Sequence, residues 1–342
     1  MTRIPLFPQA SFQAHPLVRG GHAQTLAGVY LPGKLTPYKA TPHRVTLPDG
    51  DVLIVHEDSP LKTTTSLNGS APWGVILLHG LCGSHLSPYI IRIAHKLNAL
   101  GVRTWRVDLR GCGAGVGLAR LPYHAGRSED LRTVIQFVTE QNPDIRLCPI
   151  GFSLGGNITL KYLGEADQHP LPSNVVAGMA VNPPIDLERC VSGLTSPLQR
   201  QYDRYFVKLL MLQLRQMPDG LPLEIRRTPP KGLFEFDDRY TAPVAGFGTA
   251  HNYYQQSSSK PRLKAIQRPT LILTADDDPL VDCRVFDDAE ASQFVQIFRV
   301  HSGGHLGYLS TRPPAGDHLT TDRRWMDRQV VDWVRHLQNH LD

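Results

Sequence analysis

The segment Gly151-Phe152-Ser153-Leu154-Gly155 constrains the fold of this 342-residue chain more than any other part of it. It follows the apolar residues 146–150, which indicate a short buried strand, and precedes residues 156–164, which indicate a helix ended by a glycine. In so tight a strand-to-helix turn, side chains at the flanking positions would collide with neighbouring strands. The turn would therefore lift the serine hydroxyl above a sheet, where a base and a substrate can both reach it.

From residue 74 onward, apolar segments alternate with helical ones. Strands are expected at 74–79, 102–108, 146–150, 175–181, 269–275 and 294–300, and helices at 88–100, 128–141, 156–164 and 321–340. Ser128 is the expected N-cap of the helix 128–141. Continuous apolar strands that alternate with helices are typical of an α/β protein, with a mostly parallel sheet covered by helices on both faces.

Residues 186–260 interrupt this alternation with a helical, Leu-rich and aromatic piece at 201–214, followed by a Pro-rich loop. We expect residues 186–260 to form a helical cap over the strand ends, inserted into a core made of residues 1–185 and 261–342. Within that core, residues 1–40 show no sustained period and predict a surface arm. A hairpin with an Asp49-Gly50 turn is expected at 43–56, and a mobile linker at 61–71.

A serine hydroxyl is a poor nucleophile unless a base lies within hydrogen-bond reach and a carboxylate orients that base. Where a serine turn of this kind occurs, the chain order is Ser, then Asp or Glu, then His. Two polar loops follow Ser153 in that order, and each begins where an apolar strand ends. Their side chains should therefore emerge at the same sheet edge as Ser153.

Each loop offers more than one candidate. In the first, the spacing from Ala275 favours Asp278, with Asp277 as the alternative, although either could be a solvated carboxylate or a helix cap. In the second, His305 is favoured because glycines around it allow close approach to the serine, whereas His301 at the strand end is expected to be structural.

An oxyanion that develops during acyl transfer needs two preorganised N–H donors. The backbone of Leu154, at the start of the helix after the serine, is one candidate. The other is the backbone of Leu81, in the loop 79–84 after the first core strand. The simpler interpretation of that loop is a Gly-rich turn that has no catalytic role.

Composition argues against several other classes of protein. The formal net charge of +5 comes without a dense Lys/Arg block, which argues against nucleic-acid binding. Five cysteines without a CxxC pair indicate free thiols in a reducing compartment, and the histidines lack HxxH or HExxH spacing, so no metal site is expected. No signal peptide or apolar span is recognisable, so a cytoplasmic protein without a transmembrane anchor is expected.

With these residues in hand, the chain resembles the α/β-hydrolase superfamily. More narrowly it is similar to the YheT-like esterase family, which includes the eukaryotic ABHD membrane lipases (AB-hydrolase family four). The likeness covers nearly the whole chain and is carried by residues 21–25, 79–89, 108–113 and 123–131, and in the cap by residues 236–238, 241–243 and 253–254.

The resemblance implies serine-dependent hydrolysis of carboxylic esters without metal or organic cofactor, through the triad Ser153, Asp278 and His305. Eukaryotic members carry an N-terminal membrane anchor, and its lack here favours the soluble bacterial type. His22 could help to close the site or make a structural contact. Asp108 and Arg110 are expected to form a loop-stabilising pair without a chemical role.

The favoured function is a carboxylesterase acting on a small-molecule ester with a short or medium apolar acyl group. The alternatives are a thioesterase, amidase or acyltransferase with the same triad, and a non-catalytic binding protein of the same fold. The aromatic and leucine side chains of the cap suggest an acyl pocket, although they could equally be the cap's own core. The oligomeric state is left open.

Overall fold

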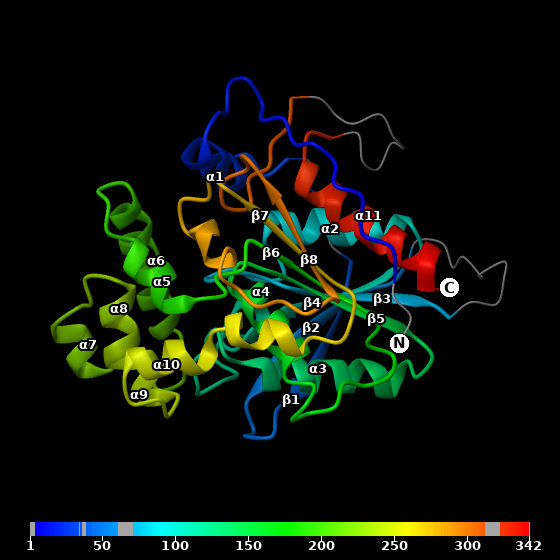
Figure 1. The fold of residues 1–342 in the computed structure, drawn as a ribbon. Coiled ribbons are helices and arrows are strands. Elements are labelled where there is room, and N and C mark those ends of the chain that lie inside the picture. The colour runs from blue at the N-terminus through cyan, green and yellow to red at the C-terminus, as the bar shows by residue number, and fades with distance from the viewer. Residues whose placement is uncertain (1–3, 34, 36–38, 61–70, 312–321, 342) are drawn as a thin grey trace.

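The computed structural model describes residues 4–33, 35, 39–60, 71–311 and 322–341. Within these residues the central sheet has eight strands in the order β1-β2-β4-β3-β5-β6-β7-β8 (Figure 1). The strands from β4 to β8 in this order are parallel, whereas β2 is antiparallel to both of its neighbours. This confirms the predicted α/β class. The strands are β1 (Thr41–Thr46), β2 (Val52–Asp58), β3 (Trp73–Leu78), β4 (Arg103–Asp108), β5 (Arg146–Phe152), β6 (Gly178–Val181), β7 (Thr270–Ala275) and β8 (Val295–Val300).

Helices cover both faces of the sheet, as the apolar strands require (Figure 1). Along β3, Val75 and Leu77 belong to one buried cluster with α2 (Pro88–Ala99) and α11 (Trp325–Leu341). Ile76 and Leu78 belong to the other cluster, with α3 (Ser128–Gln141) and α4 (Leu154–Gly164). Successive residues of a strand point to opposite faces, so this alternation places every residue of β3 in a core. The expected linker at 61–71 lies almost wholly outside the described residues.

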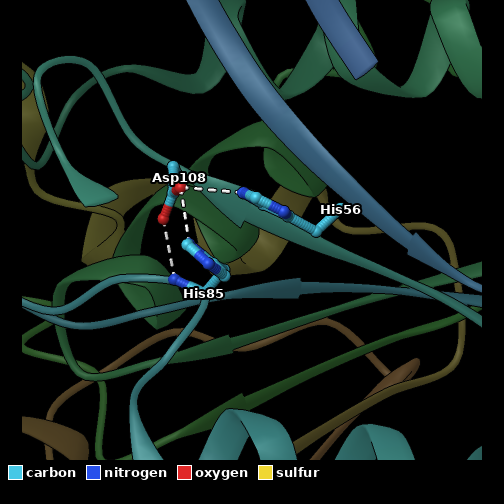
Figure 2. Close-up of side chains that lie close together, drawn as sticks. All are labelled: His56, His85 and Asp108. Atoms are coloured by element: carbon cyan, nitrogen blue, oxygen red, sulfur yellow. Dashed lines mark hydrogen bonds and ion pairs between the residues drawn. The ribbon is translucent and has the colours of Figure 1, made fainter. Parts of the chain in front are cut away.

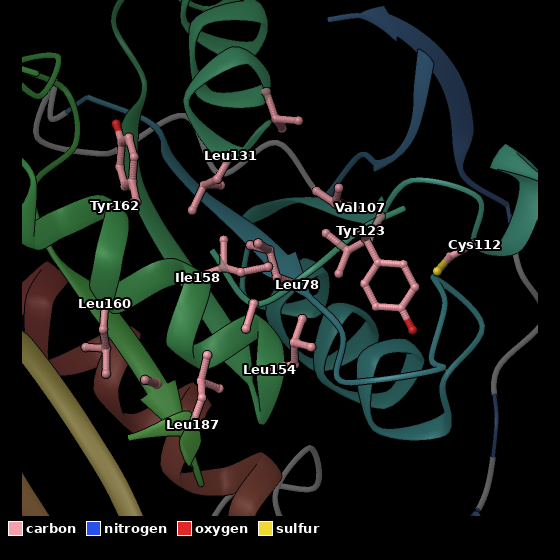
Figure 3. Packing of buried hydrophobic residues seen from close by; sticks show 14 of the residues in the cluster. Leu78, Val107, Cys112, Tyr123, Leu131, Leu154, Ile158, Leu160, Tyr162 and Leu187 are labelled. Carbon is pink, nitrogen blue, oxygen red and sulfur yellow. The ribbon is translucent and has the colours of Figure 1, made fainter. Parts of the chain in front are cut away.

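The cluster on the α3 and α4 side continues into the region expected to be the cap (Figure 3). Figure 3 shows Leu187, which follows the end of β6, beside Leu154 and Ile158 of α4. The region is helical, although a Pro-rich loop was expected after residue 214. Its short helices escape a periodicity search, and Pro222 and Pro243 stand at helix starts, where proline is tolerated. The helices are α5 (Leu187–Gly193), α6 (Gln199–Leu214), α7 (Leu223–Arg227), α8 (Leu233–Phe236), α9 (Ala242–Val244) and α10 (Ala250–Ser257), with a π-helical turn at Asp237–Thr241.

Within the expected arm lies helix α1 (Gly21–Tyr30), which the lack of a sustained period did not indicate. One local prediction is wrong: Ser128 is not an N-cap, since it is already helical and Arg127 precedes the helix. The Ser128 hydroxyl instead donates to Glu165 Oε2 at 2.6 Å, so its side chain ties α3 to the end of α4. Within the described residues, no helix has the length and hydropathy needed to cross a membrane.

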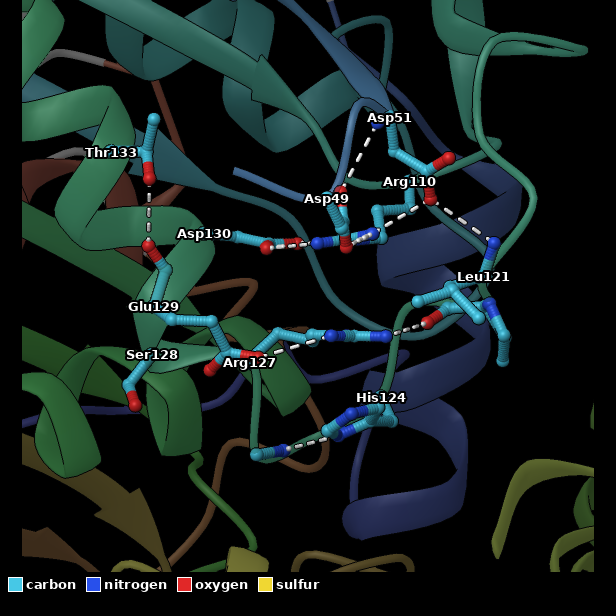
Figure 4. A network of polar contacts seen from close by, with 12 residues as sticks. Asp49, Asp51, Arg110, Leu121, His124, Arg127, Ser128, Glu129, Asp130 and Thr133 are labelled. Atoms are coloured by element: carbon cyan, nitrogen blue, oxygen red, sulfur yellow. Dashed lines mark hydrogen bonds and ion pairs between the residues drawn. The ribbon is translucent and has the colours of Figure 1, made fainter. Parts of the chain in front are cut away.

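The expected pair between Asp108 and Arg110 is also wrong, because each residue has other partners. The buried Arg110 guanidinium donates to both oxygens of Asp130 and to Asp49 and Asp51, each at 2.7 Å (Figure 4). These bonds join the β1–β2 turn to helix α3. An arginine can satisfy three carboxylates in this way because its guanidinium presents five donors in a fixed plane.

Asp108 lies in a buried cluster with His56 and His85 (Figure 2). Its Oδ2 accepts from His56 Nε2 at 3.0 Å and His85 Nδ1 at 2.7 Å, while its Oδ1 accepts the His85 backbone N–H. Burial alone would raise the pKa of Asp108, but the hydrogen bonds from both histidines outweigh it and hold that pKa below its usual range. Through these hydrogen bonds Asp108 anchors the loop after β3 to the end of β4.

Candidate active site

Ser153 occupies the turn between β5 and α4, with a left-handed φ of 52° and a ψ of −121°. A Cβ on Gly151 would lie 2.1 Å from the carbonyl oxygen of Gly155, and one on Gly155 would lie 2.6 Å from that of His79. No side chain fits at either position, so the two glycines are a steric requirement of the turn. The geometry is that of a nucleophile elbow, which presents the hydroxyl beyond the sheet edge.

Ser153, His305 and Asp278 form one continuous hydrogen-bonded line. The Ser153 Oγ lies 2.8 Å from His305 Nε2, and His305 Nδ1 lies 2.8 Å from Asp278 Oδ2. A carboxylate only accepts hydrogen bonds, so Nδ1 carries the imidazole proton and Nε2 accepts the serine O–H. The arrangement can therefore transfer the serine proton to His305 while Asp278 holds the ring in the required tautomer.

The structure distinguishes Asp278 from Asp277. Asp278 Oδ2 also accepts from Asn182 Nδ2 at 2.6 Å, and its Oδ1 accepts the N–H groups of Leu280 and Val281 at 2.8 and 3.1 Å. Asp277 instead accepts the Gly304 N–H at 2.8 Å. The two neighbouring carboxylates thus hold different parts of the histidine loop: one its imidazole, the other its backbone.

The other two histidines considered from the sequence lie elsewhere. The His301 side chain is 98% exposed, with its Nδ1 3.6 Å from Asp276 Oδ2. His22, on helix α1, stacks on Tyr202 of α6, with its Nδ1 3.1 Å from the tyrosine hydroxyl. His22 therefore joins the N-terminal arm to the helical region 187–257, and it is not one of the residues that line the cavity described below.

Leu81 and Leu154, whose N–H groups are the expected oxyanion donors, line the same cavity as Ser153. On either side of Leu81 the loop is held by a tyrosine. The Gly80 N–H donates to the Tyr89 hydroxyl at 3.0 Å, and the Cys82 N–H donates to that of Tyr123 at 2.9 Å. The Tyr123 hydroxyl in turn donates to Gln213 Oε1 of α6 at 3.2 Å, which links this loop to that helix.

Strained backbone is concentrated around this site. Throughout the described ranges, the non-glycine residues with positive φ are Cys82, Ser153, Asn182, Leu306 and Tyr308. All five lie in the loops that carry or contact the three aligned side chains. Such conformations persist only where the surrounding structure enforces them, and they cluster at functional sites.

Ser153 and His305 open into a cavity of about 1070 Å³, which includes its mouth to solvent. Its walls come largely from the apolar side chains of the helical region, among them Leu187, Leu194, Phe206, Leu210, Leu214, Met217, Leu233, Phe236, Tyr240 and Tyr253. Among the described residues that line the cavity, Asp237 carries an acidic side chain. Its carboxylate accepts a hydrogen bond from the Tyr254 hydroxyl at 2.8 Å. Burial raises the pKa of Asp237 to about 6. The cavity suits a ligand that is mainly apolar.

Sequence reasoning missed several residues that hold this site, among them Asn182, Tyr89, Tyr123 and Thr25. Asn182 carried a usable signal, because it directly follows strand β6 and so had to lie at the same sheet edge as Ser153. Tyr89 and Tyr123 lie in segments that carry the family resemblance, but the sequence does not reveal their role, since their hydroxyls contact backbone groups that only the folded loop brings near.

Comparisons with known proteins agree with this geometry. Residues 75–311 match the family described as the alpha/beta hydrolase fold. The Escherichia coli K12 protein named putative esterase YheT is 30% identical over 311 residues, which cover 88% of this chain and 85% of that protein. Human phospholipase ABHD3 is 25% identical over 327 residues, covering 94% of this chain and 77% of that protein.

Among solved structures, the Pyrococcus furiosus esterase Pf2001 matches with a TM-score of 0.56 and 17% identity, covering 91% of this chain and 98% of that one. This likeness concerns the fold alone. The family match and the relatives agree with the sheet order. This chain belongs to the α/β-hydrolase family, and its sequence relatives are of the YheT and ABHD type.

Proposed function

We propose that this protein is a serine carboxylic-ester hydrolase that cleaves small esters with a short or medium apolar acyl group. The observation that carries the proposal is the hydrogen-bonded line from Asp278 through His305 to Ser153, which ends inside an apolar cavity. The esterase and lipase character of the relatives agrees with it.

In the proposed reaction, Ser153 Oγ attacks the ester carbonyl while His305 Nε2 takes its proton. Asp278 stabilises the imidazolium that forms, and the N–H groups of Leu81 and Leu154 donate to the oxyanion. Collapse of this intermediate breaks the ester C–O bond, and the imidazolium gives its proton to the leaving alcohol. A water molecule then attacks the acyl-enzyme, with His305 acting again as the base, and releases the acid.

We place the acyl group in the cavity between Ser153 and residues 186–260, which we propose as a cap insertion in a core of residues 1–185 and 261–342. The lining is long and apolar, so it favours burial of methylene groups at about 0.8 kcal/mol each. We also propose a cytoplasmic location, which the five cysteines support because all of them are free thiols.

The test is a series of p-nitrophenyl esters from acetate to laurate, assayed with the wild type and with Ser153→Ala. We expect hydrolysis by the wild type with an optimum at an intermediate chain length, and none above background with Ser153→Ala. Matched thioester and amide substrates, and added acceptor alcohols, are run in parallel. Faster turnover of a thioester or amide, or preferential transfer to the alcohol, would replace the ester hydrolase by one of those activities. Inactivity on every substrate would favour a binding protein.

A further inference from the structure

Helix α1 packs against the loop that carries His305, and the proposed mechanism gives it no task. Thr25 is buried, and its Oγ1 accepts the His305 backbone N–H at 2.8 Å while donating to the Gly21 carbonyl at 2.7 Å. Gln24 is fully buried and binds the Leu309 backbone twice, accepting its N–H at 2.7 Å and donating to its carbonyl at 3.1 Å. Two neighbouring side chains of one helix thus hold the histidine loop at two points.

The backbones of this helix and the histidine loop also touch directly. A Cβ on Gly304 would lie 2.3 Å from the carbonyl oxygen of Gly21, and one on Gly307 would lie 2.2 Å from that of Gln24. No side chain fits between the helix and the loop at these points, so the position of the helix fixes the position of the loop. The helix also touches the aspartate loop, where a Cβ on Gly21 would lie 1.6 Å from the Asp277 carbonyl oxygen.

The loop needs such support because its backbone is strained just after the histidine. Leu306 and Tyr308 have φ values of 61° and 43°. Left-handed conformations are unfavourable for residues with a side chain, and they persist only where surrounding contacts enforce them. The hydrogen bonds that Thr25 and Gln24 accept from the loop are contacts of that kind.

We propose that helix α1 positions the base of the reaction, with Thr25 as the positioning residue that keeps His305 in line between Asp278 and Ser153. This inference rests on the proposed function. Without the Thr25 oxygen, the His305 N–H loses its acceptor, and the strained loop relaxes toward conformations in which Nε2 no longer meets the Ser153 hydroxyl.

The test compares Thr25→Val, which has nearly the same shape but no hydroxyl, with Thr25→Ser, which keeps the hydroxyl. Thr139→Val is the matched control, because the Thr139 hydroxyl also donates to a carbonyl four residues earlier in its helix, far from the active-site loops. For each variant, kcat and KM on p-nitrophenyl butyrate, the pH profile of kcat, the rate of labelling by a fluorophosphonate and the thermal unfolding midpoint are measured.

We expect Thr25→Val to lower kcat and the labelling rate by about 10- to 100-fold, the range of an unsatisfied N–H, with KM unchanged and an altered pH profile. Thr25→Ser should restore both rates, and Thr139→Val should keep them despite any loss of stability. A Thr25→Val protein as reactive as the wild type, or one whose loss only follows its unfolded fraction, would overturn the inference. A wild type that neither labels nor hydrolyses would overturn the proposed function itself.

Discussion

The two walls of the active site are built by different forces. On the core side, directional hydrogen bonds and strained backbone hold each reacting side chain in place. The Asp278 carboxylate, for example, accepts hydrogen bonds from His305, from Asn182 and from two backbone N–H groups. On the side of residues 186–260, here called the cap side after the proposed cap, apolar side chains such as Leu210 and Phe236 form the wall by packing. Hydrogen bonds depend on single atoms, whereas apolar packing depends mainly on volume. Small changes on the core side should therefore abolish the chemistry, and changes on the cap side should alter which substrate is accepted.

The largest expected effect separates the two neighbouring aspartates of the core side. Asp278→Asn should lower kcat on p-nitrophenyl butyrate by about 10⁴-fold, as loss of the orienting carboxylate does in other Ser-His-Asp enzymes, because the histidine tautomer is no longer fixed. Asp277→Asn, which loses only a carboxylate that binds the Gly304 backbone, should retain most activity. Equal losses of kcat in the two variants would show that activity does not depend specifically on the contact between Asp278 and His305.

On the cap side, Leu210→Trp should shorten the cavity. We expect kcat/KM for long-chain esters to fall by about 10- to 100-fold, while acetate hydrolysis is retained, because one lost methylene site already changes specificity by such factors. Leu212→Trp on the same helix is the control, since Leu212 is 43% exposed and does not line the cavity. Loss of acetate and laurate hydrolysis to the same extent would contradict the assignment of the acyl pocket to this wall.

Tyr123 connects the two walls, so its removal should give an intermediate phenotype. Tyr123→Phe leaves the Cys82 N–H without its acceptor and frees the loop that carries the Leu81 donor, so kcat should fall by about 10-fold. Tyr205→Phe, at an exposed position of α6, should leave kcat unchanged. A normal kcat in Tyr123→Phe would mean that the loop keeps its shape without this bond.

The smallest effect concerns stability and the acid in the cap. The folded protein raises the pKa of Asp237 to about 6 by desolvation, so the folded state disfavours the ionised form. The resulting penalty is small at pH 4, grows as the pH rises from 3.8 to about 6, and is complete above pH 6. Asp237→Asn should therefore stabilise the protein by about 1 kcal/mol at pH 7.5, a value reduced for partial solvent screening, and not at pH 4.

Chemical denaturation at the two pH values measures this difference. Asp144→Asn, at an exposed position, is the control, and it should leave the free energy of unfolding nearly unchanged at both pH values. Destabilisation of Asp237→Asn at pH 7.5 would instead identify Asp237 as an ionised anchor of the cap through its bond to Tyr254.

The same contrast explains what the sequence could predict. The parallel strands, the elbow and the order of the Asp and His loops follow from local patterns: apolar runs, glycines with no room for a side chain, and polar residues at strand ends. These patterns place Ser153, Asp278 and His305 at one sheet edge, where the structure brings them into contact. The choice of Asp278 over Asp277 came from register alone.

What escaped prediction depends on contacts between distant segments. The hydroxyl of Thr25 contacts a backbone group 280 residues away, and the motif 21–25 in which it lies does not reveal this contact. The expected pairing of Arg110 with Asp108 is another case, since the partners of Arg110 lie on two other segments, the β1–β2 turn and helix α3. Within residues 186–260 the sequence predicts the helix at 201–214 but not the short helices after it, two of which start at prolines.

The most direct test of the central claim is the stoichiometry and site of labelling by a fluorophosphonate, read by intact mass and peptide mapping. The account predicts one label per chain, on Ser153, lost in Ser153→Ala and strongly slowed in His305→Ala although Ser153 is still present. A label on another residue, or a Ser153 that reacts equally fast without His305, would contradict the claim that the aligned Asp278, His305 and Ser153 make this serine a nucleophile.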